Sequence, residues 1–245
     1  MHERLAELLA ASNAVVFFGG AGVSTESGIP DFRSEQGLYA AKERYGRSPE
    51  ELLSHGFLMR EPALFFEYYK TNLIHPDARP NAAHIALAKL EQAGKLRAVV
   101  TQNIDGLHQA AGSKAVLELH GSVHRNYCMD CKAAHSLEHI LSFKKAVPAC
   151  AKCGGVVRPD VVLYGEPLDQ NTWSKAVRAI QAADALIVGG TSLSVYPAAS
   201  LLRYYTGDRL CLINRSETPF DGGANLVIHE SIGDVLAAAV GQEIE

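Results

Sequence analysis

Short apolar runs recur along the chain, and each is followed by glycine or an amide residue. The four clearest runs are Ala14–Phe18, Ala98–Thr101, Ala185–Val188 and Leu210–Ile213. Because segments with a helical pattern separate them, these runs predict buried parallel strands of an α/β domain. Ligands of such sheets bind beyond the carboxyl ends of the strands. We therefore expect the functional site where these runs end.

Two stretches interrupt the alternation of strands and helices. The stretch 37–76 is helical and aromatic, whereas 124–156 contains four of the five cysteines. We interpret both as insertions that together form a smaller domain. The larger, sheet-containing domain is then assembled from 1–36, 77–123 and 157–245.

The composition excludes several classes of protein. The 245 residues are 47% hydrophobic and 20% charged, which is typical of a globular chain and not of a disordered or fibrous one. The formal net charge of −4 gives no general attraction to nucleic acid or anionic membranes. No run approaches the ~20 apolar residues of a membrane span, and the N-terminus lacks the order of a signal peptide. We expect a cytoplasmic protein that binds neither membranes nor nucleic acid directly.

The cysteines form the most specific chemical pattern. Cys128 and Cys131 make one C-x-x-C pair, Cys150 and Cys153 make another, and eighteen residues separate the pairs. Two such pairs present four thiolates to one tetrahedral Zn²⁺, and a site with four thiolates has no open position for water. The pattern predicts a structural zinc ribbon, and two redox pairs or free thiols are the alternative. Cys211 lies in an apolar run and is expected in the core.

The first glycine-rich turn, 19–25, follows a predicted strand and precedes a helical pattern. Such a turn lets backbone N–H groups approach a pyrophosphate. A dehydrogenase fingerprint requires glycine where Thr25 stands and an acid that ends a second strand, and the nearest acid, Glu43, ends no apolar run. The turn therefore favours a phosphate cradle over hydride transfer. In the next loop, Phe32 and Arg33 place an aromatic ring and a fixed cation near the dinucleotide, unless this loop is simply solvated.

A third group of candidates follows the run that ends at Thr101. The amides and the acid within 102–105 can hold ribose hydroxyls and a carboxamide. His120 comes after the alternating stretch 116–119, so we expect it to project from a strand end. Histidine is the side chain best suited to take a hydroxyl proton near neutral pH, which predicts a general base. A structural histidine is the alternative.

Together these segments resemble the sirtuins, the NAD-dependent protein lysine deacylases, in their short bacterial-type form. The resemblance follows the chain in order through Gly19–Ser24, Ile29–Arg33, Thr101–Asp105, His120–Gly121, the four cysteines, Pro159–Glu166, Gly190–Ser192 and Ile213–Asn214. It implies that the larger domain is a Rossmann-like NAD-binding domain. It also implies that the smaller domain combines a helical module with a zinc ribbon, and that NAD and an acyl-lysine peptide enter the cleft between the two.

The resemblance implies an NAD-dependent protein lysine deacetylase, a transferase that consumes NAD. Nicotinamide leaves its ribose, the acetyl group passes to ADP-ribose and one water enters, so that the products are free lysine, nicotinamide and O-acetyl-ADP-ribose. The histidine matching His120 is the general base that activates a ribose hydroxyl. The expected partners are acetylated lysine-containing proteins or peptides.

Matching positions then take the family's roles. Asn103 positions the nicotinamide ribose with Gln102 nearby, and Ile104 and Asp105 line the nicotinamide pocket. Phe32 shields the ribose face. The other expected NAD contacts are Ala21, Thr25, Arg33, Thr191, Ser192, Asn214 and a backbone group near Ile232. Residues expected to flank an extended peptide, through main-chain pairing that tolerates many sequences, are Val161, Val162, Leu163, Tyr164, Ser194 and Val195.

The helical insertion bears on the choice of acyl group. Sirtuins that prefer succinyl- or malonyl-lysine carry a Tyr-x-x-Arg pair there, and Phe66 and Tyr69 stand at the corresponding places of this chain. Without an arginine, burial of the acyl carboxylate is costly. We therefore expect deacetylation, and longer neutral acyl groups stay open.

Two other functions also stay open. One is mono-ADP-ribosyl transfer from the same NAD site, which some sirtuins perform. The other is a non-enzymatic zinc-ribbon binding module that has kept an NAD-sensing fold. The intact set of Asn103, Asp105 and His120 argues against the second.

Overall fold

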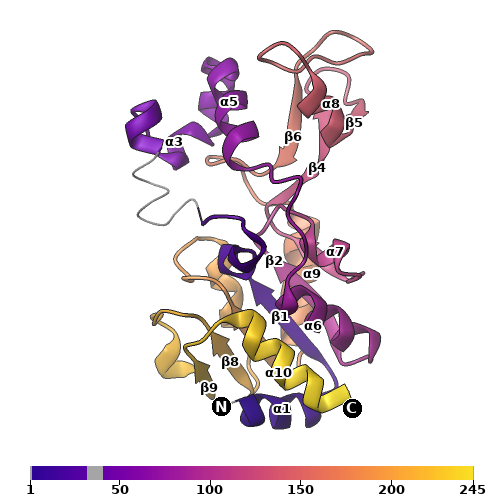
Figure 1. Cartoon of the computed structure of the whole chain (residues 1–245), viewed down its shortest axis with the longest axis vertical. Coiled ribbons are helices and arrows are strands. Elements are labelled where there is room, and N and C mark those ends of the chain that lie inside the picture. Colours follow the sequence, from indigo (N-terminus) through magenta and orange to yellow (C-terminus); the bar gives the residue numbers. More distant parts are fainter. Residues whose placement is uncertain (1, 32–40, 245) are drawn as a thin grey trace.

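The computed structural model describes residues 2–31 and 41–244. The chain forms two units along its longest axis, a parallel sheet covered by helices and a smaller unit with a second sheet (Figure 1). The expected Phe32 and Arg33 lie outside the described residues. Among the residues described, no helix is both long and apolar enough to cross a membrane.

The larger sheet has six strands in the order β3-β2-β1-β7-β8-β9, and every neighbouring pair is parallel. The strands are β1 (Val15–Gly19), β2 (Leu96–Thr101), β3 (Val116–Glu118), β7 (Ala185–Gly189), β8 (Leu210–Ile213) and β9 (Leu226–Ile228). Every residue of β1 and β7 is buried, because helices cover both faces of the sheet. The predicted parallel α/β sheet is confirmed.

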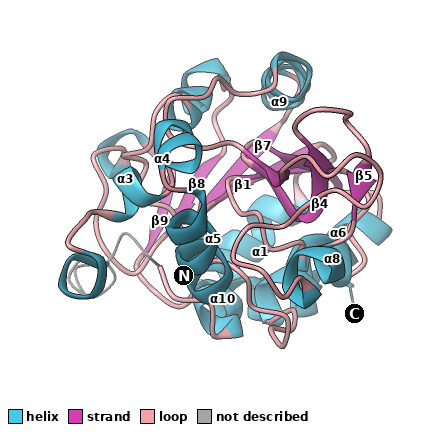
Figure 2. Ribbon diagram, turned by 90° about the horizontal axis from the view of Figure 1, so that it is seen from above, coloured by secondary structure: helices cyan, strands magenta, loops and turns pink. Residues whose placement is uncertain are grey.

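Alternate residues of β1 belong to two different cores. Val15 and Phe17 pack against one layer of helices, and Val16 and Phe18 pack against a second layer on the opposite face of the sheet. Figure 2 shows α9 on one side of the strands and α6 and α10 on the other. The first layer consists of α1 (His2–Ala10), α6 (Ala82–Gln92) and α10 (Ile232–Ile244), and the second of α9 (Gln170–Gln181) and the 3-10 helix η3 (Ala198–Tyr204).

Short helical turns connect several of these elements near the carboxyl ends of the strands. They are η1 (Ala21–Val23), η2 (Thr25–Ser27), α7 (Leu107–Ala110) and η4 (Asp221–Gly223). The first two directly follow β1, where a ligand is expected.

The smaller unit is built on a three-stranded antiparallel sheet in the order β5-β4-β6. Its elements are β4 (Gly121–Cys128), β5 (Ala134–His135), β6 (Val157–Val161), α3 (Pro49–Leu52), α4 (His55–Arg60), α5 (Pro62–Asn72) and α8 (Leu137–Ser142). Phe57 and Phe65 from the helices share one apolar core with Val157 from the sheet. The second sheet therefore reaches beyond 124–156 on both sides, and the domain boundaries stay a prediction.

Candidate active site

A cavity of about 220 Å³ lies between the two units. Its described lining comes from the loops after β1, β2, β3 and β7, from the end of β6 and the segment after it, and from the ends of α3 and α5. The predicted site residues among its lining are Ala21, Gln102, Asn103, Ile104, Asp105, His120, Val161, Val162, Leu163, Tyr164 and Val195. Residues far apart in the sequence therefore meet at the carboxyl ends of the strands.

The glycine-rich turn after β1 packs backbone to backbone against the turn after β7. The Gly22 N–H donates to the Gly190 carbonyl oxygen at 2.8 Å. A Cβ on Gly22 would lie 2.7 Å from the Gly190 Cα, and a Cβ on Gly190, where φ is +60°, would lie 2.3 Å from the Val23 nitrogen. Only glycine fits at both positions. Thr25 Oγ1 donates to the Gly22 carbonyl at 2.9 Å, and Asn81 Nδ2 donates to the Val23 carbonyl at 2.8 Å. These two hydrogen bonds fix the backbone of the turn.

Ser24 joins the loops that follow β1 and β2. Its hydroxyl donates to Asp105 Oδ2 at 2.7 Å and accepts from Asn103 Nδ2 at 3.0 Å. Asp105 Oδ1 accepts from the Leu107 N–H at 2.9 Å, and the Asn103 N–H donates to Thr101 Oγ1 at 3.0 Å. Because Ser24 is only 1% exposed, these polar groups are fixed before a ligand arrives.

His120 follows β3 and lines the cavity. Its Nδ1 lies 2.9 Å from the carbonyl oxygen of Gln102. A carbonyl only accepts, so Nδ1 carries the proton of the neutral ring and Nε2 holds the lone pair. This tautomer is the one that a general base at Nε2 requires.

A chain of hydrogen bonds runs across the ends of β2, β7 and β8. Gln102 Nε2 donates to Thr191 Oγ1 at 3.1 Å, and the Thr191 N–H donates to Asn214 Oδ1 at 2.9 Å. Asn214 Nδ2 is buried and has no hydrogen-bond partner among the described residues. An unsatisfied buried donor costs about 1–3 kcal/mol. This amide and the glycine turn fit a dinucleotide that supplies oxygen acceptors.

Several expected cofactor contacts lie outside the cavity. Ser192 Oγ is hydrogen-bonded to Ser194 Oγ at 2.7 Å near the surface. Ile232 is 4% exposed, and its side chain lies against Gly189 at the end of β7. Neither these residues nor Thr25, Thr191 and Asn214 line the cavity, which therefore covers only part of the expected dinucleotide site.

Some lining residues were given no individual role from the sequence, although five of them (Ser24, Ile29, Pro30, Gly165 and Glu166) lie within the motif segments. They are Ser24, Ile29, Pro30, Leu53, Asn72, Leu73, His75, Gly165, Glu166, Leu168, Tyr196 and Pro197. Ser24 was within reach, because it belongs to the glycine-rich motif. The residues of the helical unit gave no signal, since no local pattern shows that the end of α5 meets the strand ends.

The two residues matched to the acyl-selective pair do not line the cavity. Phe66 and Tyr69 are fully buried in the core of the smaller unit. The Tyr69 ring stacks on Phe65 with centroids 5.8 Å apart, which turns it inward. Asn72 and Leu73, at the end of the same helix, line the cavity instead.

The four cysteines of the two C-x-x-C pairs converge. All four sulfur atoms lie within 4.8 Å of one another, with Sγ–Sγ distances of 3.4 Å for Cys128–Cys153 and 3.7 Å for Cys131–Cys150. Sulfur atoms about 2.3 Å from a tetrahedral Zn²⁺ lie about 3.8 Å apart, so the donor set fits zinc. Cys211 is buried in β8, where burial raises the pKa of its thiol to about 12 and keeps it unreactive.

Comparison with known proteins identifies the family. The model of the Sir2 family matches residues 20–197. The chain belongs to the Sir2 family. A curated relative from Clostridium perfringens, "NAD-dependent protein deacetylase", is 60% identical over 238 residues, which is 97% of each chain. A protein of the same name from Clostridium acetobutylicum is 58% identical over 236 residues, or 96% of each chain.

Solved structures of Sir2 proteins share the fold. One, with a deacetylated p53 peptide and 3′-O-acetyl ADP ribose, has a TM-score of 0.89 and 38% identity, and covers 98% of this chain and 97% of its own. A Sir2 homologue in complex with NAD has a TM-score of 0.88 and 37% identity, and covers 99% of this chain and 93% of its own. The family expected from the motifs is confirmed.

Proposed function

We propose that this Sir2 protein is an NAD-dependent protein lysine deacetylase. The observation that carries the proposal is the hydrogen bond from His120 Nδ1 to the Gln102 carbonyl at 2.9 Å. Because the proton of the neutral ring is on Nδ1, the lone pair of Nε2 can act as a general base. The identity of 58–60% to curated deacetylases over nearly the whole chain supports the same activity.

In this proposal the nicotinamide end of NAD binds at the hydrogen-bonded residues Ser24, Asn103 and Asp105. Asp105 accepts from the carboxamide, Asn103 positions the ribose, and Ile104 supplies an apolar wall. Ser24 holds Asp105 and Asn103 in register through its two hydrogen bonds. His120 then takes a proton from a ribose hydroxyl. Bound NAD would release nicotinamide and supply the ADP-ribose that accepts the acetyl group, and with one water consumed the products would be nicotinamide, O-acetyl-ADP-ribose and free lysine.

The rest of NAD lies over the strand ends in this proposal. The backbone around Ala21 meets the phosphates, with Thr191 and Ser192 beside them, and Thr25 Oγ1, whose proton goes to the Gly22 carbonyl, accepts from a ribose hydroxyl. The unsatisfied Asn214 amide donates to the adenosine ribose, and the backbone near Ile232 meets adenine. Phe32 and Arg33 keep the roles expected from the motif.

The partners in this proposal are acetylated lysine-containing proteins, which dock as an extended strand beside Val161, Val162, Leu163 and Tyr164 on one side and Ser194 and Val195 on the other. The four cysteines hold a structural Zn²⁺ outside the cavity. A cytoplasmic location without direct nucleic-acid binding accords with the composition.

Mass spectrometry of an acetyl-lysine peptide, incubated with the protein with and without NAD, tests the proposal. We expect loss of the acetyl group only with NAD, together with nicotinamide and O-acetyl-ADP-ribose. A peptide that gains ADP-ribose would indicate ADP-ribosyl transfer instead. His120→Ala should lower turnover about 10²–10⁴-fold, whereas His2→Ala, which removes a surface contact to Glu230, should not.

A further inference from the structure

An ion pair joins Arg158, which is buried on β6, to Glu166, the last residue of the cavity-lining segment 161–166. Arg158 on β6 is 5% exposed, and its Nη1 and Nη2 donate to the two carboxylate oxygens of Glu166 at 2.5 and 2.9 Å. This two-pronged geometry fixes the relative orientation of both side chains, which a single contact would not.

Glu166 gathers two further donors. Its carboxylate accepts from the Leu163 N–H at 2.9 Å and lies 2.8 Å from His55 Nδ1 on α4. Burial raises the pKa of Glu166, but the hydrogen bonds from Arg158 and from Leu163 outweigh this and bring the pKa to about 2. The carboxylate is therefore ionised at any pH near neutrality.

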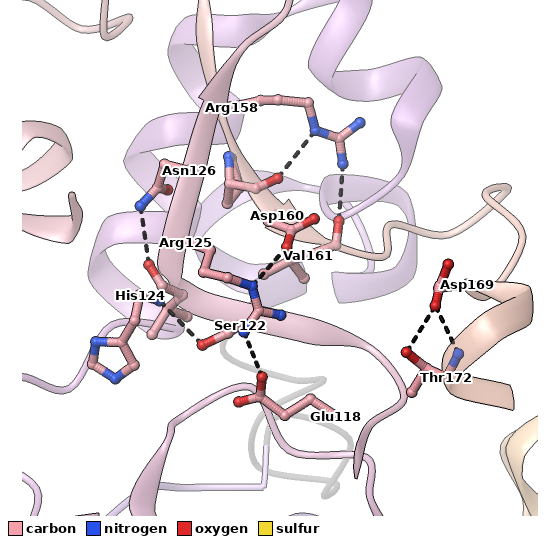
Figure 3. Close-up of polar contacts among 12 residues, drawn as sticks. Glu118, Ser122, His124, Arg125, Asn126, Arg158, Asp160, Val161, Asp169 and Thr172 are labelled. Atoms are coloured by element: carbon pink, nitrogen blue, oxygen red, sulfur yellow. Dashed lines mark hydrogen bonds and ion pairs between the residues drawn. The ribbon is translucent and has the colours of Figure 1, made fainter. Parts of the chain in front are cut away.

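Arg158 also donates hydrogen bonds to two backbone carbonyls, one of them in the segment 161–166. Its Nη2 donates to the Val161 carbonyl at 2.9 Å, and its Nε donates to the Pro159 carbonyl at 3.1 Å (Figure 3). The pair thus engages the carbonyl of Val161 and the N–H of Leu163, two alternate residues of an extended segment. The backbone N–H of Tyr164 donates to the Leu53 carbonyl at 3.0 Å.

A buried ion pair is a poor source of stability, because apolar side chains of the same volume usually stabilise a core as well or better. What this pair supplies is geometry, since it ties main-chain groups of 161–163 to β6 and α4. We propose that Arg158 and Glu166 are positioning residues that hold 161–164 in the conformation that binds the acyl-lysine peptide. This inference rests on the proposed deacetylase function.

Glu166 variants test the inference, with peptide affinity and cofactor affinity measured separately. Glu166→Ala removes the partner of Arg158 and the acceptor of the Leu163 N–H, and we expect the KM and Kd for an acetyl-lysine peptide to rise about tenfold or more. Glu166→Gln keeps an oxygen toward Leu163 and should give a smaller rise. The Kd for ADP-ribose should stay within about twofold in both, because the pair does not contact the Gln102–Thr191–Asn214 chain.

Arg125→Ala is the matched control. Arg125 on β4 bridges Asp160 on the neighbouring strand β6 at 2.9 Å and Glu118 on β3 of the larger sheet at 2.6 Å, but it engages no main-chain group of 161–164 (Figure 3). Its peptide KM should stay near that of the unmodified chain. If Glu166→Ala does not fold, Glu166→Gln alone decides.

Two results would overturn the inference while leaving the deacetylase proposal intact. One is an unmodified chain that turns over acetyl-peptide while Glu166→Gln and Arg125→Ala have the same peptide KM. The other is a loss of peptide and ADP-ribose affinity in equal measure, which would mean general loosening. An unmodified chain that removes no acetyl group with NAD present would overturn the proposed function, and the positioning role with it.

Discussion

Replacing acetyl-lysine by succinyl-lysine is the sharpest perturbation of the cavity, because it adds a carboxylate at the end of the acyl chain. The described lining contains neither arginine nor lysine. The two polar side chains that the helical unit contributes carry no fixed charge and each makes a hydrogen bond within that unit, since Asn72 Nδ2 donates to the Tyr68 carbonyl at 2.9 Å and His75 Nε2 donates to the Asn72 carbonyl at 3.0 Å. Leu53 and Leu73 also line the cavity, and their side chains have no hydrogen-bond donor or positive charge for a carboxylate.

The size of the effect follows from the cost of burying an unpaired charge. This cost is several kcal/mol per ion even after the protein relaxes. If only about 3 kcal/mol of it opposes the succinyl group, kcat/KM for the acetyl peptide exceeds that for the succinyl peptide by about 150-fold. A butyryl peptide has a similar chain length and no charge, so it separates charge from size in a cavity of about 220 Å³.

The assay is competition between equal amounts of the three acyl peptides, with NAD in excess and the products counted by mass spectrometry. We expect acetyl to be removed fastest, butyryl to be removed measurably, and succinyl to be barely removed. Equal kcat/KM for succinyl and acetyl would refute the reasoning. It would mean that a cation reaches the acyl group from outside the described lining.

Three further outcomes follow from the structure. Chelation of zinc should raise hydrogen exchange in 121–161 while β1 stays protected, and intact protein should contain about one zinc per chain; absence of the metal would refute the four-thiolate site. Because the pKa of Glu166 falls from 4.5 to about 2 on folding, its contribution to stability should be complete above about pH 4.5 and lost as the pH falls toward 2. The difference in urea midpoint between the unmodified chain and Glu166→Gln should shrink accordingly, and a difference that is constant with pH would contradict this. Gly190→Ala should weaken ADP-ribose binding and lower the unfolding midpoint, because its Cβ would lie 2.3 Å from the Val23 nitrogen; calorimetry would detect either change, and wild-type values would contradict the packing described.

The sequence was sufficient where local chemistry decides the structure. The strands of the larger sheet are buried on both faces, so β1 and β7 are written as continuous apolar runs that end in glycine. The spacing of the two C-x-x-C pairs was enough to predict that their four sulfur atoms converge on one site. His120 could be placed at a strand end, although its tautomer depends on the Gln102 carbonyl and was visible only in the structure.

The sequence was insufficient where distant segments meet. Nothing near Asn72 or His75 reveals that the end of α5 forms a wall of the cavity. The inward turn of Tyr69 depends on its stacking against Phe65, and an alignment of helix positions cannot detect this. Arg158 and Glu166 are eight residues apart, but their pairing follows from the path of 161–165 between them, with Gly165 at a φ of +89°.

The core of the smaller unit has a consequence for how the chain is made. Phe57, Phe65 and Phe66 are synthesised early, yet the last strand residues of the same core, Val157 and Val161 on β6, lie about 90–100 residues further along. At about 5–20 residues per second, a ribosome needs roughly 5–20 s to supply those strands. During that interval the aromatic residues of α5 lack their partners from β6. The nascent chain therefore passes through a window in which this helix is a target for chaperones and for aggregation.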